Sequence, residues 1–164
     1  MGVMRTECRA ALAENLRQHV DRLAGLIGPR HVGRPVALGA AATLVERELT
    51  AAGYQVARQS YRAQGEDVSN LVAELAGTSH PDKVIVLGAH YDTVPTTPGA
   101  DDNASAVAVL LEAARLLHDC QPKRTVRFVA FPCEEPPHFY TGEMGSQVYA
   151  RGCRSRGDKI LGML

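Results

Sequence analysis

The chain has 164 residues, of which 45% are hydrophobic, and its 18 basic side chains balance its 18 acidic ones. These values are ordinary for one globular domain, and balanced charge without a basic patch disfavours nucleic acid as a partner. No apolar run approaches the roughly 20 residues that would span a membrane, and charges occupy the N-terminal stretch where a signal peptide would be apolar. We therefore predict a cytoplasmic protein with no membrane partner.

Two helices are predicted before the first strand. Residues 5–27 mix apolar and charged positions at helical spacing, which predicts an amphipathic helix that covers one face of a sheet. Gly28 and Pro29 end that pattern. A second helix is predicted to begin near Pro35 and to end just before Gly53, because proline is favoured in the first turn of a helix and glycine just past the last.

The rest of the chain alternates predicted strands with predicted helices. The apolar run 84–87 predicts a strand that is covered on both faces. In chain order we expect strands at 54–62, 68–75 and 83–88, a helix at 104–118, a strand at 124–131, a short helix at 145–151, and the start of a further strand at 158–164. This order predicts an α/β fold, a three-layer α/β/α sandwich with a mostly parallel mixed sheet, in a single domain spanning residues 1–164.

Candidate functional residues follow two of the predicted strands. His90 and Asp92 come after the strand at 83–88, and Glu134 and Glu135 come after the strand at 124–131. Ligands of α/β sheets commonly bind at these strand ends. Asp92 can accept a hydrogen bond from the imidazole of His90, since side chains two residues apart in extended backbone point the same way. Asp102 opens the following helix, and its carboxylate could bridge two cations.

Each of these residues has an ordinary structural interpretation when taken alone. A histidine such as His90 is usually just hydrogen-bonded, Asp102 could be a turn or helix-capping residue, and adjacent glutamates are usually solvated. Their coincidence at neighbouring strand ends favours a metal site, in which one glutamate binds metal and the other stays free as a base. His138 lies close by, and we expect it to line a substrate pocket or to be solvated rather than to bind metal.

Four motifs resemble the M28 family of zinc metallopeptidases, which comprises aminopeptidases and related carboxypeptidases with two zinc ions on an α/β sandwich. The motifs are GAHYDT at 88–93, PGADDNAS at 98–105, FPCEE at 131–135 and MGSQVYA at 144–150. The resemblance implies that His90 binds one zinc, Asp102 bridges both and Glu135 binds the other. It also implies that Glu134 is the general base, that Asp92 orients the histidine, and that the peptide bond after Asp102 is cis.

The function that the resemblance implies is zinc-dependent hydrolysis of peptide bonds, in the first place by an aminopeptidase acting on peptide or aminoacyl substrates. Water would be activated between two metals, and Glu134 would remove its proton and pass it to the leaving amine. Family members continue beyond a strand like 158–164 to a further acidic ligand and a second histidine ligand. Neither is present here, so we expect a C-terminally incomplete domain that self-associates through its unfinished sheet edge.

Three alternatives stay open at this point. The chain could be a truncated, catalytically inactive module with the M28 fold. It could be similar to the M20 metallo-carboxypeptidases or deacylases, which the sequence HYDTVP at 90–95 also resembles, although the spacing from His90 to Asp102 suits M28 better. It could also be a glutaminyl cyclase, a class that shares the M28 fold.

Overall fold

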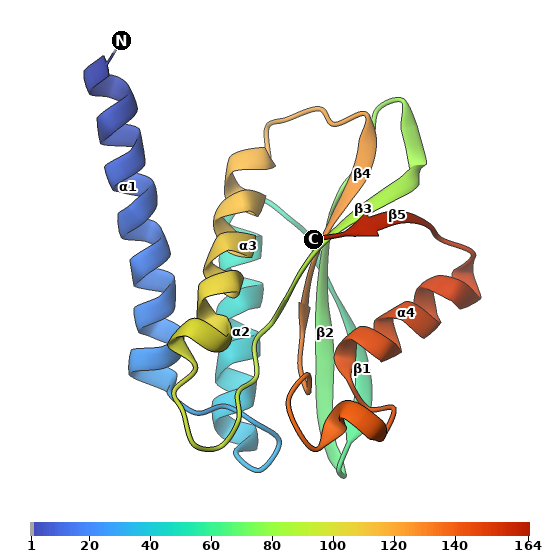
Figure 1. The fold of residues 1–164 in the computed structure, drawn as a ribbon. Coiled ribbons are helices and arrows are strands. Elements are labelled where there is room, and N and C mark those ends of the chain that lie inside the picture. The colour runs from blue at the N-terminus through green and yellow to red at the C-terminus, as the bar shows by residue number, and fades with distance from the viewer. Residues whose placement is uncertain (1) are drawn as a thin grey trace.

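The structure, a computed structural model, describes residues 2–164, with side chains from residue 7 onward. A five-stranded sheet forms its centre (Figure 1). The strands are β1 (Val56–Ala63), β2 (Glu66–Leu75), β3 (His80–His90), β4 (Arg124–Phe131) and β5 (Lys159–Met163). Each predicted strand is present within a few residues of its expected bounds.

The sheet is mixed, with the strand order β1-β2-β4-β3-β5. β3 runs parallel to both of its neighbours, β4 and β5. β2 runs antiparallel to both β1 and β4. The predicted parallel arrangement is therefore confined to β4, β3 and β5, because the tight turn between β1 and β2 forces those two strands to run in opposite directions.

Helices lie on both faces of the sheet, which confirms the α/β/α sandwich (Figure 1). α2 and α3 cover one face, and α4 lies on the other. The helical segments are α1 (Gly2–Val20), η1 (Asp21–Ile27), α2 (Pro35–Ala51), η2 (Ala100–Ala104), α3 (Ser105–Leu117), η3 (His138–Tyr140) and α4 (Gly145–Arg156). None of the helices within residues 2–164 is long and apolar enough to cross a membrane.

The prediction that the N-terminal helix covers the sheet is wrong. α1 packs mainly against α3, outside the layer that α2 and α3 form (Figure 1). The contact is partly polar, because the buried carboxylate of Glu112 on α3 accepts a hydrogen bond from Asn15 Nδ2 of α1 at 3.1 Å. The spacing of apolar residues predicted a helix, but it could not say which element the helix would pack against.

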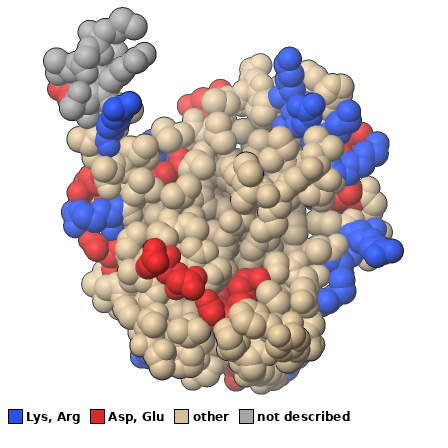
Figure 2. Space-filling view, viewed as in Figure 1, with Lys and Arg blue, Asp and Glu red and all other residues tan. Residues whose placement is uncertain are grey.

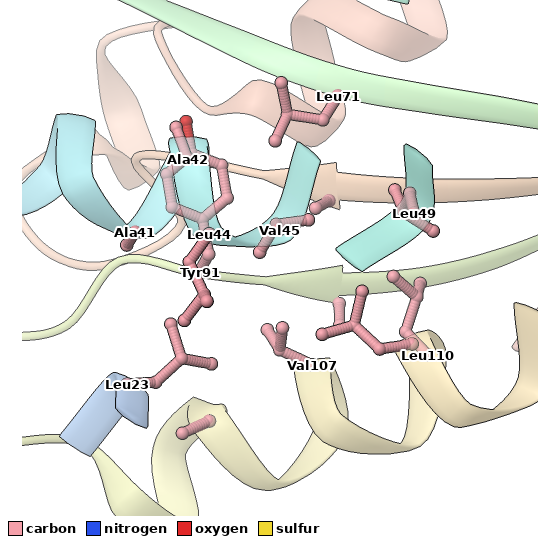
Figure 3. Packing of buried hydrophobic residues seen from close by; sticks show 14 of the residues in the cluster. Leu23, Ala41, Ala42, Leu44, Val45, Leu49, Leu71, Tyr91, Val107 and Leu110 are labelled. Carbon is pink, nitrogen blue, oxygen red and sulfur yellow. The ribbon is translucent and has the colours of Figure 1, made fainter. Parts of the chain in front are cut away.

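The main core lies between the sheet and the layer of α2 and α3. Side chains from both helices and from β2 meet there (Figure 3). Each fully buried aliphatic side chain contributes about 1.5–3 kcal/mol. Fully buried members include Leu23, Val45, Leu49, Leu71 and Val107.

A smaller cluster covers the opposite face of the sheet. Val84 and Val86 of β3 pack there with Phe131, Tyr149 of α4 and Cys153 of α4. Both faces of β3 are therefore covered, as its uninterrupted apolar run predicted. This packing fixes the position of β3 and thus of the residues that follow it.

Candidate metal centre

The parallel pairing of β3 with β4 brings the two predicted groups of site residues together. His90 is in register with Phe131 at the carboxyl ends of these strands. The N–H of Tyr91 then donates to the carbonyl of Phe131 at 2.9 Å, which extends the pairing by one more residue. Acidic side chains gather on this part of the surface, whereas basic side chains lie mostly on the side of α4 (Figure 2).

The loop after β3 folds back and returns Asp102 to the end of the strand. Gly99 has a positive φ of 62°, and a Cβ atom there would lie 2.3 Å from Thr93 Cγ2. A side chain at this position would therefore both strain the backbone and clash. The peptide bond between Asp102 and Asn103 is cis, as the resemblance implied.

His90, Asp102 and Glu135 form a cluster in which one potential ligand atom of each lies within 4.8 Å of the others. His90 Nε2 is 3.0 Å from Asp102 Oδ1 and 3.9 Å from Glu135 Oε1. The side chain of Asp102 is 71% exposed and that of Glu135 is 14% exposed, so the cluster opens to solvent on one side. One imidazole and two carboxylates are ligands that zinc accepts, so the residues present fit that ion.

Asp92 lies behind the imidazole and is 2% exposed. Its Oδ1 atom is 3.4 Å from His90 Nδ1, on the side of the ring that faces away from Asp102. The same carboxylate accepts the backbone N–H groups of Glu134 at 3.2 Å and Glu135 at 3.3 Å. Asp92 therefore joins the loop after β3 to the loop after β4.

Glu134 is held apart from the three clustered residues. Its Oε1 accepts the backbone N–H of Ser146 at 2.6 Å, and its Oε2 accepts the Ser146 hydroxyl at 2.7 Å. Ser146 lies in the first turn of α4, where the helix dipole also favours a negative charge. Both oxygens of Glu134 are therefore oriented by one residue.

Burial and neighbouring negative charges shift the pKa values of His90 and Glu135. Burial acts to lower the pKa of His90, but contact with Asp92 and the negative charges of Asp92, Asp102 and Glu135 outweigh it and raise the pKa. The pKa of Glu135 is also raised, by burial first and then by the charge of Asp102. A cation bound here would relieve the repulsion between these carboxylates.

Two residues near the site were not singled out from the sequence, and one expectation needs correction. Ser146 lies within a quoted motif, MGSQVYA, but no role was assigned to it. Arg30 gave no signal at all, yet it is fully buried and hydrogen-bonded to the loop after β3. His138 is 4% exposed, so the expectation that it could be solvated is wrong. Its backbone N–H donates to the backbone carbonyl of Glu135 at 3.1 Å.

Residues 70–164 match the model of a protein family described as peptidase family M28. This is more than half of the chain and includes all five predicted site residues. The fold is that of the class that the motifs suggested. The chain belongs to peptidase family M28. This match decides between the M28 prediction and the M20 alternative in favour of M28.

Curated relatives match more of the chain than residues 70–164. The protein YfbL of Escherichia coli (strain K12), described as uncharacterized, is 39% identical over 150 residues, covering 87% of this chain and 46% of YfbL. A probable zinc metalloprotease of Pyricularia oryzae is 36% identical over 135 residues, covering 77% of this chain and 26% of that protein. The chain thus spans less than half the length of these relatives.

Solved structures share the fold. The leucine aminopeptidase precursor of Bacteroides thetaiotaomicron aligns with a TM-score of 0.75 and 26% identity, over 92% of this chain and 61% of that one. A glutaminyl cyclase of the same organism, bound to N-acetylhistamine, gives a TM-score of 0.75 and 26% identity, over 92% and 60%. These two structures carry different activities on one fold, so the fold does not decide between them.

Proposed function

We propose that the chain is part of a zinc-dependent peptidase, and that its activity is that of an aminopeptidase. The observation that carries the proposal is the cluster of His90, Asp102 and Glu135 at the carboxyl ends of β3 and β4. The separate position of Glu134, which Ser146 orients, supports a role as a base.

In this proposal the site holds two zinc ions. His90 would bind one, Glu135 the other, and the exposed carboxylate of Asp102 would serve both. This division gives each ion two protein ligands, fewer than the three that are typical of a catalytic zinc. The remaining coordination positions of each ion would be open to water or substrate.

Glu134 is the proposed general base. Zinc, when bound, would polarise the scissile carbonyl and lower the pKa of the attacking water. Glu134 takes a proton from that water as it adds to the carbonyl carbon, and passes the proton to the amine nitrogen as the C–N bond breaks. Ser146 supports this role, because its two hydrogen bonds fix the orientation of the carboxylate.

The test combines metal analysis with an activity assay on the intact chain. Zinc is measured by mass spectrometry, and hydrolysis of an aminoacyl chromogenic substrate is measured with and without a chelator. The proposal expects bound zinc and hydrolysis that the chelator removes. Glu134→Gln is the matched variant, expected to keep the zinc and to lower the rate by about 10²–10⁴-fold. Zinc without hydrolysis would favour the inactive module, and absence of zinc would contradict the proposal.

A glutaminyl cyclase is the second candidate function. The similarity to the cyclase structure, at 26% identity over 92% of this chain, favours it. A cyclase would convert an N-terminal glutaminyl peptide to its pyroglutamyl form with release of ammonia, whereas an aminopeptidase would release free glutamine. Incubation with one glutaminyl peptide, followed by mass spectrometry of the products, separates the two.

A further inference from the structure

Arg30 lies between η1 and α2 and has no solvent exposure. Arginine is almost never fully buried unless its charge is paired. Here the guanidinium donates to backbone carbonyl oxygens instead of forming a close ion pair. A side chain this costly to bury calls for a structural or functional reason.

Five backbone carbonyl oxygens accept hydrogen bonds from this guanidinium. Nε donates to one, Nη1 to three and Nη2 to one, so all three nitrogens of the planar group donate. The acceptors are Tyr91 at 2.6 Å, Leu23 at 3.2 Å, Gly28 at 3.1 Å, Pro98 at 2.7 Å and Gly99 at 3.1 Å.

Three of these acceptors belong to the loop that joins His90 to Asp102. Tyr91 directly follows His90, and Gly99 lies three residues before Asp102. Arg30 thus holds both ends of the loop, while its contacts with η1 and the turn after it anchor the guanidinium to the core.

The backbone of Arg30 adds two more bonds to the same loop. Its N–H donates to the hydroxyl of Thr93 at 3.0 Å, and its carbonyl accepts the N–H of Thr93 at 2.9 Å. Thr93 has no solvent exposure. The loop is therefore fixed near its start and near its end by one residue from a distant part of the sequence.

We propose that Arg30 is a positioning residue for the metal centre, which holds His90 and Asp102 at their 3.0 Å separation before metal arrives. This inference rests on the proposed function, since it assigns metal binding to those two residues. The physical reason is preorganisation: a loop already fixed in the binding geometry loses less conformational entropy when the ion binds.

Two substitutions weaken different bonds between Arg30 and the loop. Arg30→Lys keeps the backbone bonds to Thr93, but its amine cannot reach five carbonyls at once. Thr93→Val removes the hydroxyl that accepts the backbone N–H of Arg30 while keeping the shape of the side chain, and it gives an independent test should Arg30→Lys fold poorly.

The experiment compares these two variants with the unaltered chain and with Arg127→Lys. Arg127 lies in the middle of β4, outside the metal cluster, and pairs with Glu74 and Asp158. Hydrogen exchange of residues 91–99 is measured by mass spectrometry without metal. Zinc affinity is measured by titration calorimetry, and Co²⁺ absorption spectra report the ligand geometry.

Both Arg30→Lys and Thr93→Val are expected to speed exchange of residues 91–99, to weaken zinc binding by about 10–100-fold and to alter the Co²⁺ spectrum. Arg127→Lys should change none of the three. Unchanged zinc affinity in both loop variants would overturn the inference, and so would an equal loss in Arg127→Lys. If the unaltered chain binds no zinc, the proposed function fails. Hydrogen exchange of residues 91–99 still tests the role of Arg30 in that case. Unchanged exchange in Arg30→Lys and Thr93→Val would show that Arg30 does not hold the loop.

Discussion

The carboxylate of Asp92 accepts the backbone N–H of Glu134 at 3.2 Å, and this bond joins the loop after β3 to the loop after β4. The same carboxylate accepts the N–H of Glu135 and lies against the imidazole of His90. Asp92 thus sets where Glu134 and Glu135 stand relative to His90. Its role extends beyond orienting the histidine.

Asp92→Asn is expected to weaken zinc binding by about 10–100-fold. An amide has one acceptor oxygen, so it cannot satisfy His90 and both backbone N–H groups at once. Titration calorimetry on the variant and the unaltered chain measures the loss. Glu74→Gln, on the exposed end of β2, is the control and should bind zinc as the unaltered chain does. Equal affinity in Asp92→Asn would contradict this role.

Glu112→Gln is expected to destabilise the fold at neutral pH by about 1–3 kcal/mol. Burial alone would raise the pKa of Glu112, but hydrogen bonds from Arg115 and Asn15 outweigh it and leave the pKa lowered below 4.5. A carboxyl with a lowered folded pKa stabilises the fold above its unfolded pKa and loses that contribution as pH falls through the folded value.

The loss of stability in Glu112→Gln should depend on pH. Urea denaturation at pH 7 should separate Glu112→Gln from the unaltered chain, and the difference should shrink as the pH falls below about 4.5. Glu14→Gln, on the exposed face of α1, should change stability little at either pH. A difference for Glu112→Gln that stays constant with pH would argue against an ionised, hydrogen-bonded Glu112.

The edge strand β5 is expected to promote self-association of this chain. β5 lies at the end of the strand order, and all five of its residues are exposed, including Leu161 at 55% and Met163 at 54%. Unpaired edge strands with apolar side chains associate readily. Light scattering should show oligomers that Leu161→Lys reduces, and a monodisperse monomer of the unaltered chain at high concentration would contradict the expectation.

Most of the fold and the cluster could be predicted from the sequence because both depend on local patterns. An uninterrupted apolar run marked β3, and the residues just past the ends of parallel neighbours had to meet. The packing of α1 against α3 could not be predicted, because an apolar stripe does not name its partner.

Arg30 was missed for a different physical reason. Its acceptors are backbone carbonyls, which every residue carries, so no side-chain pattern marks them. Its contacts also cross more than 60 residues of sequence to Tyr91 and Gly99. Ser146, by contrast, stood within a quoted motif, and its role followed only from the two bonds to Glu134.

The central claim is that His90, Asp102 and Glu135 bind zinc, and anomalous diffraction from crystals of this chain grown with zinc tests it most directly. The account predicts one anomalous peak about 2.0–2.2 Å from His90 Nε2 and an oxygen of Asp102, and a second peak at a similar distance from oxygens of Asp102 and Glu135. Crystals in which zinc binds elsewhere, while these three side chains stay free of metal, would contradict it.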